Sequence, residues 1–336
     1  MGEVGASIEG EFGGDWQALI QDSIRYGASD IHLCSDAKSP TIRWRIHGQL
    51  TTPQVITPSD FHRLVSGLKL HANMDIATAW LPQDGYLDIP NGGYHARVGS
   101  LPTLYGEDMV IRLIPHQTRP LEGLGFESAI TDCLRGWCQR RSGLIVLTGP
   151  TGSGKSSTLM ALMEQMATHH RRMVISLEDP VEHVVPGVRQ SPIHPPTGYT
   201  YASGLRAVLR LDPDVIVVGE LRDADTARLT VEAAYTGHLV LSTLHTDSVR
   251  RSVTRLHQLG VESVWLEQVM GGILSQQLAP IPCSQCVGGC PNCHGLGITG
   301  RRATGELLDV PEGSSLAGFP TIIEPSLTWI HPSPTG

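Results

Sequence analysis

Long hydrophobic runs are missing from this sequence. No apolar stretch approaches the ~20 residues that a transmembrane helix needs. Met1 is followed by GEVGASIEGEFGGDW instead of the basic and then apolar segments of a secretory signal. A cytoplasmic location is therefore expected.

An excess of basic residues is missing as well. The chain carries 25 Lys and Arg against 33 Asp and Glu, which gives a formal net charge of −8 and a pI near 6.0. A protein that coats nucleic acid through a broad basic face needs the opposite balance, so direct nucleic-acid binding is not expected. The 336 residues and 40% hydrophobic content allow a sizeable core and suggest two domains.

Cysteine is sparse outside one short segment. Of the 7 cysteines, Cys34, Cys133 and Cys138 are scattered, and the other four lie between residues 283 and 293. This distribution does not suit the disulfide framework of a secreted domain. It points instead to a local metal site.

The four clustered cysteines form two C-x2-C pairs. Such pairs are the usual way to close a tetrahedral Zn²⁺ site. Only Val287-Gly288-Gly289 separates the pairs, and its glycines allow the tight turn that a single site needs. Structural zinc is the favoured interpretation, with metal-free thiols and a redox switch as the alternatives. The ligands would be Cys283, Cys286, Cys290 and Cys293.

Residues 15–116 are predicted to form a small α/β domain. Asp15 can cap a first helix, and Thr57-Pro58 can open a second. The alternation in IRWRI is typical of a half-buried strand. The stretch PHQTRPLEGLG then interrupts both periodicities, so a linker is placed at residues 117–124.

Residues 125–310 are predicted to form a second domain of a different kind. Short apolar runs alternate with helical segments: LIVLTG, MVISLED, VIVVGE and HLVLSTLH. Continuous apolarity over about four to five residues suits strands buried on both faces of a mainly parallel sheet. The predicted class is α/β, with the cysteines at 283–293 as a subdomain and a loose Pro- and Ser-rich tail over 311–336.

One glycine-rich segment is the most specific motif in the chain. Residues 149–156 read GPTGSGKS, a complete G-x4-G-K-S pattern between the strand LIVLT and the helical run SSTLMALMEQM. Glycines let backbone N–H groups and a helix N-terminus point at phosphates, the lysine adds positive charge, and the serine offers a Mg²⁺ ligand. We expect ATP and Mg²⁺ here; a ligand-free turn is the alternative. The binding residues would be Gly149, Thr151, Gly152, Ser153, Gly154, Lys155, Ser156 and Ser157, with Ser156 on the Mg²⁺.

Two carboxylates follow apolar strands, as nucleotide hydrolysis requires. VIVVGE ends in Glu220, an acid expected beside Mg²⁺ and the attacking water, and Gly219 stands where many P-loop enzymes carry a metal-binding Asp. MVISLE ends in Glu178, which could orient water or act as a base. Helix capping by Glu220 and a structural turn at Asp179-Pro180 are the alternatives.

The ordered motifs LTGPTGSGKS, SLEDPVE, LRLDPDVIVVGELRD and TGHLVLSTLHT resemble a known family. They are similar to the Walker A motif, acidic box, Walker B region and histidine box of the type II secretion and type IV pilus motor ATPases. ASDIH, LPQDG and RVGSLPT look like that family's N-terminal domain, so the similarity covers residues 16–310. The resemblance implies a RecA-like P-loop domain with a smaller, PAS-like α/β N-terminal domain, assembled as a homo-hexamer.

The resemblance also assigns roles to single side chains. It makes Glu220 the Walker B acid and Glu178 the catalytic residue of the acidic box. His238 and His245 match histidine-box residues near the γ-phosphate, with a satisfied structural histidine as the alternative for each.

Arginines of the N-terminal domain are implied to act across a boundary. Arg97 and Arg112 match family arginines that reach bound phosphate across a domain or subunit boundary, although solvated strand arginines give the same pattern. Two departures remove other expected arginine contributions. The chain has Thr78-Ala79-Trp80 where the family usually has an acid and two arginines, and Arg45-Ile46-His47-Gly48 where it usually has Arg-x-Asp-Gly.

The expected function is an ATP-hydrolysing motor for assembly of a type IV pilus, a type II secretion pseudopilus or DNA-uptake machinery. Its expected partner is an inner-membrane platform protein, which would hold the chain peripherally at the membrane. A catalytically weak, nucleotide-binding scaffold subunit of the same machinery is the alternative. A nucleotide kinase would need an acceptor pocket and an arginine-rich lid, and the sequence offers neither.

Overall fold

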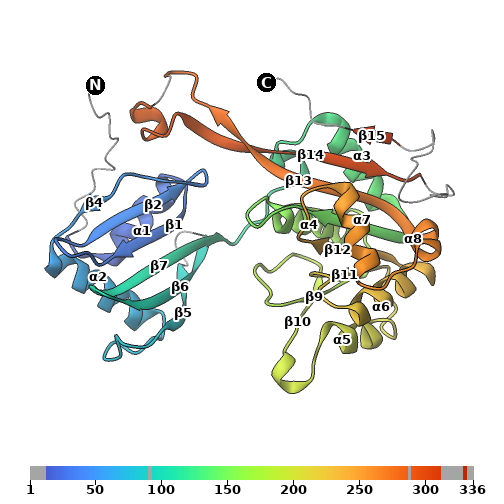
Figure 1. Cartoon of the computed structure of the whole chain (residues 1–336), viewed down its shortest axis with the longest axis horizontal. Helices are drawn as coiled ribbons and strands as arrows, with labels where there is room; N and C mark the ends of the chain where they lie inside the picture. Colours follow the sequence, from blue (N-terminus) through green and yellow to red (C-terminus); the bar gives the residue numbers. More distant parts are fainter. Residues whose placement is uncertain (1–12, 90–92, 287–288, 312–327, 331–336) are drawn as a thin grey trace. The chain divides into compact units, whose positions relative to one another are not determined.

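The computed structural model describes residues 13–89, 93–286, 289–311 and 328–330. The chain divides into two compact units (Figure 1): one combines residues 1–117 with 280–301, and the other combines 118–279 with 302–336. The cysteine segment thus groups with the first unit, although its place in the sequence suggested a subdomain of the second. Most of the tail expected at 311–336 lies outside the described residues.

The first unit is built on an antiparallel sheet. Its elements are α1 (Trp16–Arg25), β1 (Ala28–Cys34), β2 (Thr41–Ile46), β3 (Gln49–Leu50), β4 (Gln54–Val55), α2 (Pro58–His71), β5 (Gln83–Ile89), β6 (Tyr94–Thr103) and β7 (Gly106–Pro115). The strands lie in the order β3-β2-β1-β7-β6-β5, and β4 also pairs with β2. Both expected helices and the IRWRI strand are present.

The two helices of this unit begin at the predicted caps and share one core with the sheet. The Asp15 carboxylate accepts a hydrogen bond from the backbone N–H of Gln17 at 2.9 Å, and Thr57 Oγ1 accepts one from Asp60 at 3.1 Å. Such caps satisfy N–H groups that lack a partner in the first turn. The helices and the sheet bury a common apolar cluster that includes Leu19, Ile20, Leu64, Leu68, Ile31, Trp44 and Met109.

A charged pair lies inside the first unit. The side chain of Lys69 on α2 is 1% exposed, and its Nζ lies 2.6 Å from Oε1 of Glu107, which is 8% exposed. The same Nζ donates to the backbone oxygen of Thr78 at 2.9 Å. These two contacts join α2 to the start of β7 and to the loop before β5. Breaking either one would leave a buried charge poorly partnered, which is costly.

The second unit is a mainly parallel sheet flanked by helices. Its elements are α3 (Ser128–Gln139), β8 (Gly143–Thr148), α4 (Lys155–Glu164), β9 (Val174–Glu178), β10 (Arg189–Pro192), α5 (Tyr201–Val208), β11 (Val215–Val218), α6 (Ala224–Tyr235), β12 (Leu239–Leu244), α7 (Val249–Gln258), α8 (Ser263–Val269), β13 (Met270–Pro282), β14 (Ile298–Asp309) and β15 (Thr328–Ile330). The strands lie in the order β10-β9-β11-β12-β8-β13-β14-β15, and the pairs from β10 to β13 are parallel. None of the described helices combines the length and apolarity that a bilayer crossing requires.

The central strands of this sheet are buried on both faces, as their apolar runs predicted. Successive residues of β8 enter two different apolar clusters. Leu144 and Val146 pack with α5, α6, α7 and α8, whereas Ile145 and Leu147 pack with α3 and α4. The expected fold class, an α/β P-loop unit and a smaller α/β unit, is confirmed.

Candidate functional site

Most residues predicted to act on nucleotide gather at one edge of the parallel sheet. Four neighbouring strands end there in the order β9, β11, β12, β8. Glu178 is the last residue of β9, Glu220 lies two residues beyond β11, His245 directly follows β12, and the glycine-rich loop follows β8. Because neighbouring parallel strands all end on the same side of a sheet, the structure places these groups at consecutive strand ends on that side.

The loop between β8 and α4 has a backbone that favours glycine. Gly149, Gly152 and Gly154 have φ values of +146°, +79° and +89°. A Cβ on Gly149 would lie 2.3 Å from the carbonyl oxygen of Gln276, and a Cβ on Gly154 would lie 2.8 Å from Gln276 Nε2. The glycines therefore let the loop fold tightly against Gln276 of β13. The loop leads into the N-terminus of α4, where backbone N–H groups and the helix dipole favour an anion.

The side chains of this loop divide between buried and exposed positions. Lys155 is buried, and its Nζ donates to the backbone oxygens of Gly149 at 2.6 Å and Pro150 at 3.0 Å. Burial lowers the pKa of Lys155, and the nearby Glu220 carboxylate opposes that shift. Ser153 Oγ is buried, and no residue in the described part of the chain offers it a hydrogen bond. Thr151, Gly152 and Ser156 are exposed, while Gly154 and Ser157 are half-buried.

Two hydrogen bonds that sequence reasoning missed brace this loop. Thr148 Oγ1 donates to the backbone oxygen of Thr246 at 2.6 Å, which joins the end of β8 to the residue after His245. Thr158 Oγ1 donates to Oε1 of the buried Gln276 at 2.8 Å. Nothing in the motif spacing indicates these partners, because β13 reaches the loop only through the folding of the sheet.

Glu220 stands among polar partners at the end of β11. Its side chain is 17% exposed, and His245 Nε2 lies 3.4 Å from its Oε2. The guanidinium of Arg222 forms an ion pair with Oε1, and Arg222 Nη1 also lies 3.8 Å from Asp179 Oδ2. Sequence reasoning found Glu220 and His245 but missed Arg222, although it is only two residues from the acid.

The space around residue 219 explains why a glycine stands there. A Cβ there would lie 2.9 Å from the Tyr201 hydroxyl and 3.1 Å from the backbone oxygen of Leu177. The Asp that many P-loop enzymes carry at this position therefore has no room. Burial, with the carboxylates of Glu220 and Asp179, raises the pKa of Tyr201 to about 12. Its hydroxyl thus remains protonated at neutral pH.

Glu178 is half-buried at the end of β9. Its Oε1 accepts hydrogen bonds from Ser176 Oγ at 2.5 Å and from Gln190 Nε2 at 2.9 Å. Gly219 lies beside it, since a Cβ on that residue would be 3.6 Å from Glu178 Cα. The ends of β9 and β11 therefore bring Glu178 next to Gly219, the residue that precedes Glu220.

The two predicted histidines lie at opposite ends of β12. His238 precedes the strand, where its backbone oxygen accepts from Gly143 at 3.1 Å and its Nδ1 lies 3.0 Å from the backbone oxygen of Ala233. The six residues of β12 span ~20 Å at about 3.3 Å per residue. The structure thus brings His245 to the glycine-rich loop of its own chain and does not bring His238 there.

Arg97 and Arg112 lie opposite one another on β6 and β7 of the first unit. Both are exposed, and Arg112 Nε donates to Asp30 Oδ1 at 2.9 Å. Arg45 Nε lies 3.8 Å from Asp30 Oδ2. Arg45 therefore joins the two predicted residues in one arginine face (Arg45, Arg97 and Arg112), although its sequence context departs from the expected pattern.

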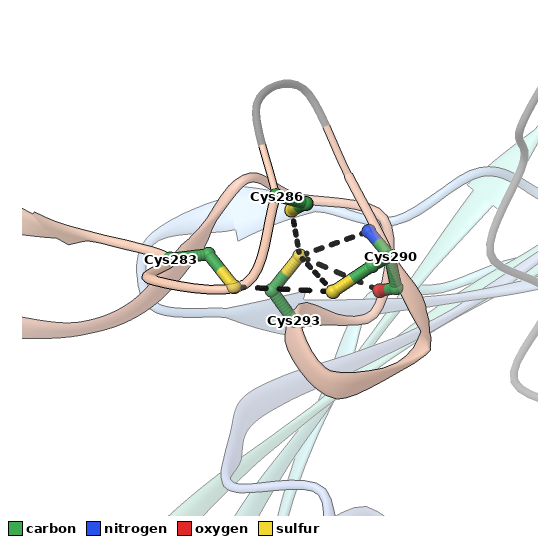
Figure 2. A group of neighbouring side chains, drawn as sticks. All are labelled: Cys283, Cys286, Cys290 and Cys293. Carbon is green, nitrogen blue, oxygen red and sulfur yellow. Dashed lines mark hydrogen bonds between the residues drawn. The ribbon is translucent and has the colours of Figure 1, made fainter.

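The four clustered cysteines converge on one point. Figure 2 shows them gathered with their sulfur atoms facing one another, and all four sulfurs lie within 4.8 Å of each other. The Sγ atoms of Cys286 and Cys293 are 3.6 Å apart, those of Cys290 and Cys293 3.7 Å, and those of Cys283 and Cys290 3.9 Å. A tetrahedral Zn²⁺ with Zn–S bonds of about 2.3 Å sets its sulfurs about 3.8 Å apart. The cluster therefore fits one zinc ion.

The surroundings of the cluster also suit a thiolate ligand. Cys293 Sγ accepts from the backbone N–H groups of Cys290 at 3.2 Å and Gly297 at 3.3 Å. Of the linking residues expected to turn tightly, 287 and 288 lie outside the described part of the chain. Gly289 has φ +136°, and a Cβ there would lie 2.6 Å from the backbone oxygen of Gly295. A side chain at position 289 would therefore clash, so glycine is needed for the chain to turn between the two C-x2-C pairs.

Comparison with known proteins agrees with this arrangement. A family model described as Type II/IV secretion system protein matches residues 14–316. Putative type II secretion system protein E of Escherichia coli K12 is 39% identical in an alignment 325 positions long, which covers 87% of this chain and 65% of that protein. Type II secretion system ATPase E of Vibrio cholerae is 37% identical over 88% of this chain and 64% of its own length. The chain thus spans less than two thirds of these relatives.

Solved structures show the same architecture. The crystal structure of the pilus retraction motor PilT with bound ADP aligns with a TM-score of 0.65 and 30% identity, and covers 88% of this chain and 83% of that one. The Legionella pneumophila ATPase DotB aligns with a TM-score of 0.69 at 24% identity, over 88% of this chain and 80% of its own, and is a likeness of fold. With the motifs, the edge of the sheet and the family match in agreement, the chain belongs to the type II/IV secretion system protein family.

Proposed function

We propose that this chain hydrolyses ATP as a subunit of a secretion or pilus motor. The observation that carries the proposal is the placement of the glycine-rich loop, Glu178, Glu220 and His245 on four consecutive strand ends. A phosphate-binding loop alone would suit many nucleotide-binding proteins. Two carboxylates beside it supply what hydrolysis needs in addition, which is a means to orient and deprotonate water.

The phosphate chain of ATP would be held by the loop and by Lys155. Phosphate oxygens can replace the carbonyl oxygens of Gly149 and Pro150 as acceptors for the Lys155 ammonium, and the buried Ser153 hydroxyl offers one more donor. The hydroxyl of Ser156 and the carboxylate of Glu220 are oxygen ligands of the kind Mg²⁺ takes. When bound, Mg²⁺ would neutralise charge on the phosphates.

The carboxylates would act on the attacking water. Glu178 and Glu220 lie on adjacent strand ends, and His245 and Arg222 hold Glu220 from two sides. A fixed carboxylate near the terminal phosphate can align water for in-line attack and accept its proton. His245, whose side chain is 54% exposed, is open to contact a phosphate oxygen.

Binding and chemistry should be separable by mutation. Lys155→Ala is expected to weaken ATP binding, whereas Glu220→Gln should retain ATP and lose turnover, because the phosphate charge and the organisation of water are distinct contributions. Glu232→Gln serves as the matched control, because it makes the same carboxylate-to-amide change at an exposed position on α6. Wild-type rates in Glu220→Gln would sink the assignment, and an ATP-binding wild type without turnover would favour the scaffold reading.

A complete site is proposed to need a second subunit of a homo-hexamer. Arg97 and Arg112 of the arginine face are exposed, and an arginine placed at developing phosphate charge can raise phosphoryl-transfer rates by about 10³ or more. Specific activity should therefore rise with protein concentration. Mixing Arg97→Ala/Arg112→Ala subunits with Glu220→Gln subunits should restore some turnover through hybrid sites, whereas concentration-independent activity from a stable monomer would refute a shared site.

The cysteine cluster is proposed to bind one structural Zn²⁺ through Cys283, Cys286, Cys290 and Cys293. The sulfur spacing and the N–H donors to Cys293 support this choice. A closed set of four thiolates leaves no open position for substrate, so the metal would stabilise the local fold.

The cellular task is proposed from the relatives. Their names include type II secretion system protein E, a type IV pilus assembly ATPase of Thermus thermophilus and a pilus retraction motor. We infer that this chain drives assembly of a pilus or pseudopilus, or DNA-uptake machinery, from the cytoplasmic side. An inner-membrane platform protein would be its partner and would hold it at the membrane periphery.

A further inference from the structure

Gln190 is a side chain that the function described so far does not use. It lies on β10, the edge strand, and is the direct neighbour of Ser176 in the parallel pairing with β9. Glu178 comes two residues after Ser176, so both side chains share one face of the strand. The edge strand thereby brings an amide beside the carboxylate of the acidic box.

The amide of Gln190 is held in one orientation. Its Oε1 accepts from the backbone N–H of Val185 at 2.6 Å, which settles which end of the amide carries the nitrogen. Nε2 donates to the backbone oxygen of His183 at 2.8 Å and to Glu178 Oε1 at 2.9 Å. Two backbone partners therefore clamp the amide, and its remaining N–H points at the carboxylate.

A second donor reaches the same oxygen of Glu178. The buried Ser176 hydroxyl lies 2.5 Å from Oε1, and the backbone oxygen of Glu178 accepts from Ile193 at 2.8 Å just beyond β10. Within the described ranges, no residue donates to Oε2. One oxygen is thus fixed by the protein and the other is left for solvent or substrate.

We propose that Gln190 is a positioning residue for Glu178, whose amide holds Oε1 so that Oε2 faces the attacking water. The inference rests on the proposed ATP hydrolysis and on the part of Glu178 in it. A carboxylate that is already oriented needs no rotational search before it meets water, and such pre-orientation lowers the barrier to reaction. A side chain that merely stapled the loop between β9 and β10 would not affect the chemistry of Glu178.

Gln190→Glu tests the contact between the amide and Glu178. The new side chain keeps the size of glutamine and an acceptor for Val185, but it sets a second carboxylate against Glu178. Two carboxylates in contact retain a proton between them. We expect kcat at neutral pH to fall by about tenfold or more, and the acidic limb of the pH–rate profile to move to higher pH by about one unit or more. KM for ATP should change by less than about threefold, since the loop and Lys155 are untouched.

Two further variants complete the test. Gln139→Glu introduces the same charge at an exposed site at the end of α3 and should leave the profile unchanged. The exchange Glu178→Gln/Gln190→Glu restores an amide–carboxylate hydrogen bond with the carboxylate on the wrong strand. It should recover the melting temperature lost in Gln190→Glu without recovering turnover.

The outcomes are distinct. A wild-type pH–rate profile in Gln190→Glu, with Glu178→Gln inactive, would overturn the positioning role and leave the proposed function standing. Recovery of turnover in the exchanged double variant would also overturn it, because the position of the carboxylate would then not matter. If the wild-type protein binds ATP but never hydrolyses it, the proposed function fails and this inference fails with it.

Discussion

Replacing Lys69 by Met is expected to destabilise the first unit more than most single substitutions. The side chain of Lys69 is 1% exposed and that of Glu107 is 8% exposed, and their charged atoms are 2.6 Å apart. Removing one partner of a buried ion pair costs about 3–5 kcal/mol, because the other charge remains buried alone. The lost hydrogen bond to the Thr78 backbone adds on the order of 1 kcal/mol.

The assay must report on this unit alone, because a chain with two compact units need not unfold in one step. Hydrogen exchange of peptides covering α2 and β7 under increasing urea supplies such a local free energy. Lys38→Met is the matched control, since Lys38 is exposed and surface substitutions usually stay within about 0.5 kcal/mol.

The double substitution Lys69→Met/Glu107→Leu tests the physical reason. Replacing both members of a buried pair with apolar residues is often close to neutral. We therefore expect the double variant to be more stable than Lys69→Met alone. The reasoning is refuted if Lys69→Met lowers the local free energy of unfolding no more than Lys38→Met does. It is also refuted if the double variant loses as much stability as Lys69→Met and Glu107→Leu lose together.

Two further predictions concern Gly219, the residue before Glu220, and the clustered cysteines. Gly219→Ala should lower turnover, because its Cβ would meet the Tyr201 hydroxyl at 2.9 Å, and adding Tyr201→Phe should restore part of the rate; a steady-state ATPase assay with wild-type rates for Gly219→Ala would count against this crowding. Metal analysis of protein purified without chelator should give about one zinc per chain, as a closed four-ligand site requires. A chelator should then make the four clustered thiols reactive, while Cys133 and Cys138 stay unreactive because burial raises the pKa of each to about 12; metal-free protein of unchanged stability would remove the zinc proposal.

Sequence patterns predicted the parts of the fold that repeat or carry a fixed motif. The caps Asp15 and Thr57 begin the two helices where expected, and the apolar runs gave the central strands of the parallel sheet. Local patterns did not indicate β5, because its alternating burial is not matched by residue type: Gln83 and Gly85 face inward, whereas Tyr86 is exposed. Nor did they show that residues 280–301 group with the first unit, since that grouping depends on contacts far apart in the sequence.

The candidate site shows the same limit. Glu178 and Glu220 were predictable because each ends an apolar strand in a motif. Gln190 was not, because its partners lie 12, 7 and 5 residues away in the sequence and meet only when β10 pairs with β9. His238 is the opposite case. The histidine-box motif predicted it near the site, yet it precedes β12, whereas the site lies at the other end of that strand.

The burial of the central strands on both faces has a consequence for how the chain folds. In a half-exposed strand, a slip of one residue is penalised because apolar side chains would turn to water. That penalty is weak in β8, β11 and β12, where both faces are apolar. Alignment must then depend on the polar residues that follow the strands, since a slip would draw Glu220 or His245 toward the core. The residues proposed to handle phosphate would thus also serve as markers of correct strand alignment, and a neutral replacement there could cost folding accuracy as well as turnover.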